Sequence, residues 1–427
     1  MFSFKSFVTE ARNNQEIMHN GMPENLYNFM FHLSSPSDPH GKLKKSLHEM
    51  TLDEMADYYD QLDEEERKRD YIDVNSQKKS KVKFDPEEVA PAMKLPKTRA
   101  LIDKAREDIP SGNIHKRIAI GLRAASESMR NESPQESRAK LRESQQVFRG
   151  FMNSRGFRGT PTLLGKNMKT EKSSGEGVMT KGLFLAPHAT SGLHGFDVCP
   201  KASSDCRRDC LALTANANRI HADHALSGKV WRTHFLAKHP EHFARILDNE
   251  IANHTKSAKK AGMKSGVRLN GTSDLSWEKH MPHIFERHPD TQFYDYTKMA
   301  NRVGRRDNPS NYHLTLSHTG TGHEESNDHE VANTLARGHG VAMVYQRGRG
   351  VPKPTHVEDV KSGRRYPVIN GDKDDNTFDR HESAGLSEGG QGQGVVSGLQ
   401  LKGVSNEQAG KFANPVDKDG IIRINKK

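Results

Sequence analysis

The sequence has little cysteine and a small apolar share. Only three of its 427 residues are Cys, which excludes a disulfide framework. All three fall between Cys199 and Cys210, which indicates one dedicated use in a reducing compartment. Apolar residues make up 33% and the mean hydropathy is −0.86, whereas globular domains usually have an apolar share of about 45–50%. Part of the chain is therefore expected to lie outside a packed core.

Long hydrophobic runs are also missing. No apolar stretch approaches the roughly 18–20 residues that span a bilayer, so no membrane partner is expected. Residues 1–12 include three Phe but no continuous apolar core and no small-residue cleavage site, unlike a secretory signal. These absences predict a soluble protein of the cytoplasm.

Positive charge is unevenly distributed along the chain. Residues 1–150 contain 25 basic and 25 acidic side chains, so the whole formal net charge of +10 belongs to residues 151–427. A basic domain favours a polyanionic partner such as DNA, RNA or a nucleotide. The arginines expected on its loops are Arg302, Arg305, Arg306, Arg347, Arg349, Arg364 and Arg365.

The first 150 residues have the pattern of helices separated by polar linkers. The helices are expected over Phe2–Ala11, Leu52–Arg69, Pro96–Asp108 and Glu136–Phe151. Their faces are thin in Leu, Ile and Val, which predicts a helical, partly disordered N-terminal region over residues 1–150. Such a region is expected to act as an adaptor or flexible arm.

Residues 151–427 are expected to form a cysteine-centred β/α domain. From Gly182 onward, short β-rich runs alternate with helical stretches, which is the rhythm of a mainly parallel sheet. The expected strands are Gly182–Ala186, Gly266–Asn270, Gln292–Thr297, Tyr312–Ser317, Gly340–Tyr345, Tyr366–Ile369 and Val395–Leu401. The expected fold class is α/β, an incomplete β/α (TIM-like) barrel with mainly parallel strands.

Polar side chains lie at the ends of most of these strands. In β/α barrels the catalytic groups lie on the loops after the carboxyl ends of the strands, so these residues are expected to face the same site as Cys199. The candidate catalytic residues, as general acids, bases or electrostatic partners, are Asp274, Asp295, Lys298 and Asp372. The candidate cofactor-binding residues are Asn270, Ser317 and Tyr345. The alternative is that these are ordinary turn residues and that the charged ones form salt bridges.

The cysteine segment has the chemistry of a metal site. Six residues separate Cys199 from Cys206, and three separate Cys206 from Cys210. The second pair is expected to project from one helical face, with Cys199 reaching it from the preceding loop. Three thiolates can hold an iron-sulfur cluster with one iron left open, or a closed tetrahedral zinc together with a histidine. The candidate histidines are His188, His194 and His221. Three unligated thiols are the third alternative.

Several motifs of this chain resemble the bacteriophage gene product 88 domain family. The first are CPKASSDCRRDCL at 199–211, VRLNGTSDLSW at 267–277 and FYDYTK at 293–298. Two later ones are VINGDKDD at 368–375 and GVVSGLQLKG at 394–403. The resemblance covers residues about 155–405 and implies a phage origin and a cysteine-centred β/α domain. The Phe-rich N-terminal peptide is similar to the short leaders of many proteins of large tailed phages.

A more distant similarity is to radical S-adenosylmethionine enzymes, in which three Cys after the first strand of a partial barrel hold a four-iron cluster. The position of the cysteine loop agrees with that plan. The spacing differs, because those enzymes usually have three residues and then two between their cysteines. This likeness implies an iron-sulfur cluster and S-adenosylmethionine as cofactors.

Three hypotheses of function follow. The first is a phage-encoded iron-sulfur enzyme acting on a nucleotide or nucleic acid. The second is a zinc-stabilised nucleic-acid-binding or replication protein. The third is a virion-associated structural or host-interaction protein, in the host cytoplasm or packaged in the virion, whose N-terminal region contacts other virion or phage proteins.

Overall fold

The computed structural model describes residues 18–19 and 22–23 and, with short gaps, residues 94–425. The gaps are 111, 160, 167, 175, 209, 211–218, 322, 374–375, 377, 379–393 and 403–404. The chain divides into two compact units, Met1–Lys81 and Val82–Lys427. In the first unit the structure describes two short antiparallel strands, β1 (Met18–His19) and β2 (Met22–Pro23). The helices expected over 2–11 and 52–69 lie outside the described residues.

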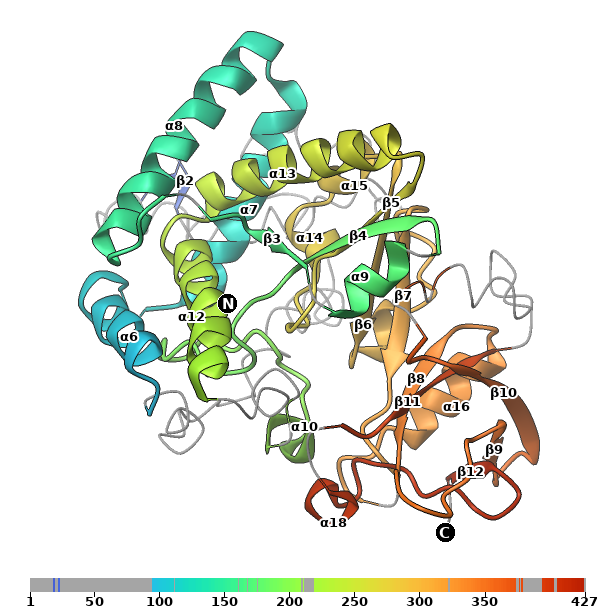
Figure 1. The fold of residues 1–427 in the computed structure, drawn as a ribbon. Coiled ribbons are helices and arrows are strands. Elements are labelled where there is room, and N and C mark those ends of the chain that lie inside the picture. Colours follow the sequence, from blue (N-terminus) through green and yellow to red (C-terminus); the bar gives the residue numbers. More distant parts are fainter. Residues whose placement is uncertain are drawn as a thin grey trace, which may run out of the picture. The chain divides into compact units, whose positions relative to one another are not determined.

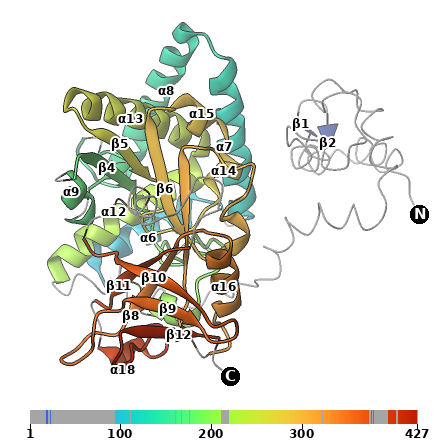
Figure 2. The same ribbon diagram turned by 90° about the vertical axis from the view of Figure 1, so that its right-hand side faces the viewer.

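The second unit is built on a ten-stranded sheet (Figure 1). In chain order its strands are β3 (Leu164–Gly165), β4 (Val178–Leu183), β5 (Lys264–Arg268), β6 (Thr291–Thr297), β7 (Tyr312–Ser317), β8 (Val341–Tyr345), β9 (His356–Asp359), β10 (Arg364–Asn370), β11 (Val396–Gln400) and β12 (Ile421–Ile424). Their order across the sheet is β12-β9-β10-β11-β8-β7-β6-β5-β4-β3. Figure 2 shows β8 to β12 gathered in one part of the unit, beside the helix α16 (Asp328–Ala336).

The expected α/β class with mainly parallel strands is confirmed. Only β3 with β4 and β9 with β10 pair in antiparallel fashion. The sheet is open, with β3 and β12 at its edges, so the strand pairings do not close it into a barrel. Each expected strand overlaps an observed one, although β4 begins at Val178 rather than at Gly182. The sequence analysis missed β3, β9 and β12.

Helices α6 (Pro96–Asp108), α7 (Ile114–Asn131) and α8 (Pro134–Ser154) belong to the second unit. They pack against α12 (Arg219–Lys238) and α13 (Pro240–Lys260), as Figure 1 shows. Fully buried side chains on these three helices include Ile102, Leu122 and Met152. The structure thus places the division of the chain after Lys81, whereas the boundary expected near residue 150 falls inside α8.

Two of these helices agree with the sequence expectation and one does not. The observed α6 matches the expected range, and α8 begins two residues earlier than Glu136 because Ser133 forms a capping box with Glu136. The sequence analysis missed α7, whose buried face includes Ile118 and Leu122. The described helices contain none that is long and apolar enough to cross a membrane.

The loops that carry the cysteines and the candidate site residues leave the sheet at one edge. Strands β4, β5, β6, β7, β8, β11 and β10 are parallel neighbours, so all seven end at the same edge, called the carboxyl edge below. The loops that leave this edge carry the cysteines after β4 and the 270–276 segment after β5. They also lead into three short helices, α10 (Ser204–Arg208), α14 (Trp277–His280) and α15 (His283–Arg287).

Candidate active site

The loop after β5 is organised by the side chain of Asn270, two residues after the strand ends. The Oδ1 atom of Asn270 accepts hydrogen bonds from Ser273 Oγ at 2.9 Å, Leu275 N at 2.9 Å and Trp277 Nε1 at 3.1 Å. Its Nδ2 donates to Leu275 O at 2.9 Å. A Cβ at Gly271 would meet Leu183 O at 2.8 Å, so only glycine fits there. The amide of Asn270 is thus used within its own loop rather than presented to a ligand.

This loop holds Cys199 in place. Asp274 N donates to Val198 O at 2.7 Å, and the Cys199 thiol lies 3.8 Å from Thr272 O. On its other side the thiol accepts from His188 N at 3.4 Å. Two segments more than 70 residues apart in sequence therefore meet at the first cysteine.

The other two cysteines lie in the segment that follows Cys199. Cys206 lies in α10, where its N–H donates to Ser203 Oγ at 3.2 Å. Helix α10 ends at Arg208, so Cys210 lies beyond it, and the expectation that Cys206 and Cys210 share a helical face is wrong. Residues four apart share a face only within a continuous helix, and α10 ends before Cys210.

The three thiols are near one another. All three cysteines are free. Burial raises the pKa of the Cys199 thiol well above its ordinary value, and Asp197, Cys210 and Cys206 raise it further. Lys229 of α12 lies near Cys210, which opposes the lowering of the Lys229 pKa by burial.

The described residues do not form a closed metal site. Within the described ranges, no group of three or more His, Cys, Asp or Glu side chains could hold a metal ion. His188 is buried and burial lowers its pKa to about 4, whereas His194 is exposed. The side chain of His221 lies outside the described residues.

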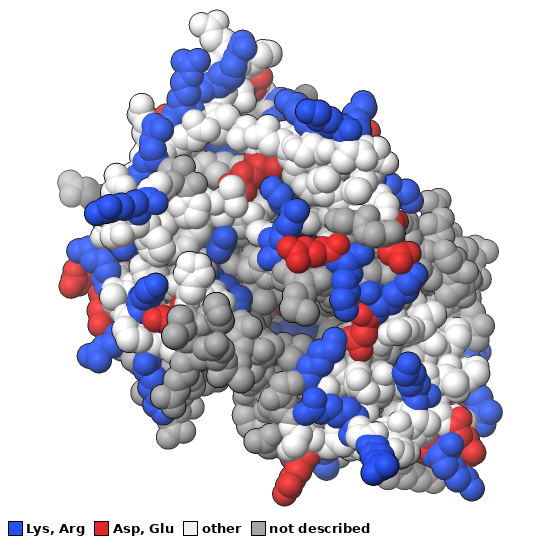
Figure 3. All heavy atoms as spheres, viewed as in Figure 1, with Lys and Arg blue, Asp and Glu red and all other residues white. Residues whose placement is uncertain are grey.

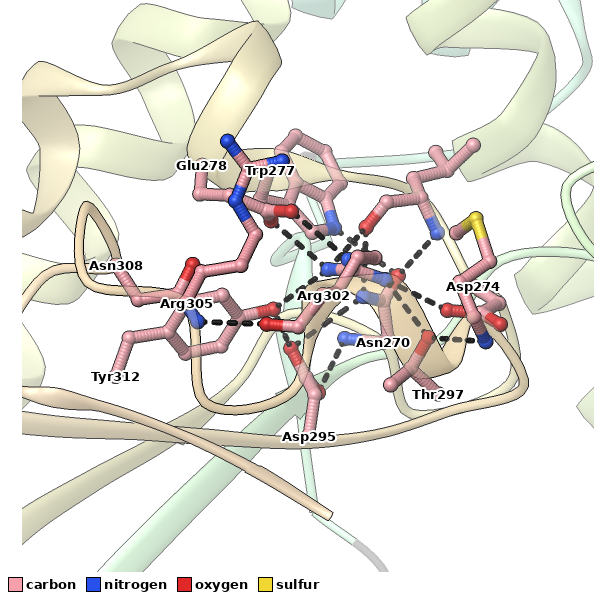
Figure 4. A network of polar contacts seen from close by, with 12 residues as sticks. Asn270, Asp274, Trp277, Glu278, Asp295, Thr297, Arg302, Arg305, Asn308 and Tyr312 are labelled. Atoms are coloured by element: carbon pink, nitrogen blue, oxygen red, sulfur yellow. Dashed lines mark hydrogen bonds and ion pairs between the residues drawn. The ribbon is translucent and has the colours of Figure 1, made fainter. Parts of the chain in front are cut away.

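Arg302 forms the centre of a buried polar network (Figure 4). It is 1% exposed, and its guanidinium pairs with Asp274 Oδ1 at 2.7 Å and with both oxygens of Glu278 at 2.8 Å. It also donates to Tyr312 Oη at 3.2 Å, and that hydroxyl donates to Asp295 Oδ2 at 2.9 Å. Burial acts to lower the pKa of Arg302, but Tyr312, Glu278 and Asp274 raise it above its ordinary value.

This network corrects one expectation about the basic loops. Arg302 was expected to be a loop arginine available to a polyanion, but it lies in the short 3-10 helix Ala300–Arg302 with its charge turned inward. Two other arginines of that set are also paired, Arg305 with Asp307 and Arg365 with Glu358. The sequence shows how many arginines these segments contain, but not which way the side chains point.

The candidate carboxylates Asp274 and Asp295 are both engaged by protein groups. Asp274 Oδ2 accepts from Lys298 N at 2.8 Å, opposite its ion pair with Arg302. Asp295 Oδ1 accepts from Asn270 N at 2.7 Å. Burial raises the pKa of Asp274, and burial raises that of Asp295 to about 7 although Arg268 opposes the shift. Both residues fasten strand ends together.

The amine of Lys298 is held by protein groups at the end of β7. Its Nζ donates to Ser317 Oγ at 3.1 Å and to His318 O at 2.7 Å, and it lies 5.6 Å from the centre of the Phe412 ring. Burial lowers the pKa of Lys298, whereas Cys206, Asp274 and Cys199 act in the opposite direction. In the part of the chain that the structure describes, no salt bridge joins this amine to a carboxylate.

Tyr345 and Asp372 form a separate group on the same edge. Asp372 follows β10 and accepts from Gln400 N at 2.8 Å and from Lys402 Nζ at 2.6 Å. Burial raises the pKa of Tyr345 at the end of β8, and Asp372 adds to that shift. The structure therefore brings all seven strand-end candidates to the carboxyl edge, but only Asn270, Asp274, Asp295, Lys298 and Ser317 are joined through shared contacts.

Sequence reasoning missed Arg268, which lies next to this group. Arg268 lies with its guanidinium 4.9 Å from the ring centre of Tyr296 and 6.0 Å from that of Tyr294. Residues that alternate along one strand share a face, so Tyr294, Tyr296 and Lys298 could have been grouped by spacing alone. The neighbour from β5 depends on the register of the sheet, which the sequence does not state.

Comparison with known proteins gives a family for this chain. The family model of gene product 88 matches residues 160–414, which is more than half of the chain and contains every residue of the candidate site. The chain belongs to the gene product 88 family. The gene product 88 match ends before β12. This match does not show the similarity to radical S-adenosylmethionine enzymes. No curated protein and no solved structure matches the chain.

Proposed function

We propose that this gene product 88 protein is a phage-encoded iron-sulfur enzyme that acts on a nucleotide or nucleic acid. The observation that carries the proposal is a group of three free thiols where parallel strands end, in which Cys206 and Cys210 act electrostatically on Cys199, and Cys199 and Cys206 act on the buried amine of Lys298. The consecutive order of β4 to β8 also supports a partial barrel, in which that edge is the usual place for chemistry.

The donor set fits a cluster better than a single zinc ion. Zinc–sulfur bonds of about 2.3 Å place the thiolates of one tetrahedral zinc roughly 3.8 Å apart. No such closed donor group exists among the described side chains. A cluster of several irons is larger and holds its thiolates further apart, and in this proposal the three free thiols, which influence one another electrostatically, are its ligands.

The protein residues have defined tasks in this proposal. When bound, the cluster supplies one-electron chemistry. Cys199 must lose its proton to become a ligand, and its raised pKa makes cluster binding dependent on pH. Lys298 and Lys229 place positive charge beside the thiolates and so favour their ionised form. S-adenosylmethionine enters this proposal only through the more distant likeness, from which the spacing of the cysteines departs.

Single cysteine variants test this proposal. Cys199→Ser, Cys206→Ser and Cys210→Ser, purified without oxygen, should each lose most of the iron and acid-labile sulfide of the parent protein and remain folded by circular dichroism. Ser257→Ala, on an exposed turn of α13, is the matched control and should keep both. Retention of iron and sulfide in all three cysteine variants would refute the assignment.

A zinc-stabilised nucleic-acid-binding protein is the second candidate. Figure 3 shows that Lys and Arg outnumber Asp and Glu on one face of the molecule. They are spread over this face from α8 to the region of β9 and β10 and do not form one continuous stripe. Dispersed positive charge attracts nucleic acid but does not define a binding path on the surface. This observation therefore supports general affinity for nucleic acid more than it supports the enzyme hypothesis.

A further inference from the structure

One face of the sheet presents cationic and aromatic side chains close to the carboxyl edge. Strand pairing sets Phe293 opposite Val267, and the alternation of side chains then places Tyr294, Tyr296 and Lys298 on the same face as Arg268. The pairing of β6 with β7 adds Ser317 to this face, in agreement with its hydrogen bond to Lys298.

Arg268 leans toward the carboxyl edge. By register it lies opposite Tyr294, yet its guanidinium is nearer to the ring of Tyr296, at 4.9 Å against 6.0 Å. Lys298 follows Tyr296 by two residues and lies one residue past the end of β6. Arg268 and Lys298 therefore belong to the same face near the carboxyl edge, and the tyrosine rings hold Arg268 in place.

The groups around the charge of Lys298 differ from those around the charge of Arg302. Arg302 is neutralised by two carboxylates, Asp274 and Glu278. The Lys298 amine instead has a hydroxyl, a carbonyl and nearby thiols around it, without a carboxylate at ion-pair distance among the described residues. A poorly hydrated ammonium is costly unless an anion meets it, so this arrangement favours an anionic ligand at that point.

We propose that Lys298, with Ser317 beside it and Arg268 on its tyrosine platform, forms the phosphate subsite of a nucleotide ligand. The subsite deepens the proposed function because it names the substrate class of the same edge. Two cations suit a ligand with two phosphate groups, so a nucleoside diphosphate is the expected form. The cysteines lie next to the Lys298 end of the subsite, which places the reacting part of the ligand near them.

Equilibrium binding to the full chain tests the subsite, with adenosine diphosphate, adenosine and inorganic phosphate as probes. Adenosine diphosphate should bind the parent protein more tightly than adenosine. Lys298→Met should weaken the diphosphate at least about tenfold, as expected for loss of a charged hydrogen bond. Lys298→Arg should stay within a few-fold of the parent. The exposed Lys353→Met is the matched control and should bind as the parent does.

Several results would overturn the subsite. Equal diphosphate affinity of Lys298→Met and the parent would do so, as would equal affinity of the parent for adenosine and the diphosphate. Binding of a short single-stranded DNA but of no nucleotide would replace the nucleotide with nucleic acid. If Lys298→Met does not fold, Ser317→Ala decides, because unchanged affinity in that variant contradicts the subsite and weaker binding supports it.

The subsite and the iron-sulfur proposal can fail separately. Ser317→Ala should carry as much iron as the parent protein while it binds the diphosphate more weakly. A parent protein that binds the diphosphate through Lys298 but contains no iron would retain the subsite and remove the cluster. A protein with iron but without nucleotide binding would do the reverse.

Discussion

Asp295 has the most strongly perturbed environment among the candidate acids. Its carboxyl is 2% exposed and is held by Asn270 N and Tyr312 Oη. Burial raises its pKa to about 7, with Arg268 acting in the opposite direction. A carboxyl with such a pKa resembles a general acid or base in its titration, but the contacts described here fasten β5, β6 and β7 together.

The titration of Asp295 predicts a specific pH dependence of stability. An acid whose pKa is higher in the folded chain than in the unfolded chain favours folding only while it is protonated. This contribution is present near pH 4 and is lost as the pH rises through 7. The free energy of unfolding of Asp295→Asn, relative to the parent, should therefore increase by on the order of 2 kcal/mol between pH 4 and pH 7.

Urea denaturation at a series of pH values measures this difference. Asp307→Asn is the control, because burial is slight there and Arg305 lowers the pKa of that carboxyl. The control should show no gain toward neutral pH. A constant difference between Asp295→Asn and the parent across the range would mean that Asp295 is ionised throughout.

At the scale of elements, Arg302 joins the loops that follow β5 and β6 to strand β7. Its partners Asp274 and Glu278 lie in the segment after β5, and Tyr312 begins β7. Through Asp274 Oδ2 the same network holds the backbone of Lys298. The network therefore fixes where the Lys298 amine stands without touching the cysteines.

Removal of Arg302 is expected to be strongly destabilising. Arg302→Met leaves Asp274 and Glu278 buried without their cation, so the free energy of unfolding should fall by about 3–5 kcal/mol. Arg305→Met breaks an exposed pair with Asp307 and should cost less than about 1 kcal/mol. Chemical denaturation of both variants makes the comparison. Equal, small losses would show that the Arg302 network contributes little.

The sequence predicts the parallel centre of the sheet better than its margins. Strands β6, β7 and β8 are mostly buried and appear in the sequence as short runs rich in aromatic and aliphatic residues. Strand β12 lies at an edge and β9 pairs antiparallel with β10, so neither follows the strand-helix rhythm used to find the others. Helix α7 was overlooked because its apolar face is interrupted by charged and small residues.

The candidate site was predictable in its location but not in its contacts. Successive strand ends of a parallel sheet converge, so the gathering of Asp274, Lys298 and Ser317 followed from their positions in the sequence. Which cation each carboxylate meets depends on register and on loop direction. For that reason Arg302 was expected in solvent, and the place of Arg268 beside Tyr296 was not foreseen.

At the scale of the whole molecule, the division after Lys81 makes a clear prediction. A chain that begins at Val82 should unfold cooperatively, with the same thermal midpoint that the second unit has in the full-length chain. A chain that begins at residue 151 loses α6 and α7 and most of α8, which exposes buried residues of α12 and α13 such as Phe235 and Phe243. It should aggregate or melt without cooperativity. Differential scanning calorimetry of both chains measures this, and a stable fold from residue 151 would restore the boundary expected from the sequence.

The claim that the three cysteines hold a cluster at the carboxyl edge is tested most directly by metal analysis of the full chain. The protein should be purified without oxygen, and its iron, zinc and acid-labile sulfide should be measured per chain. The account predicts several irons and a similar amount of sulfide per chain, with little zinc. One equivalent of zinc without iron or sulfide would contradict it and would favour the zinc-stabilised alternative.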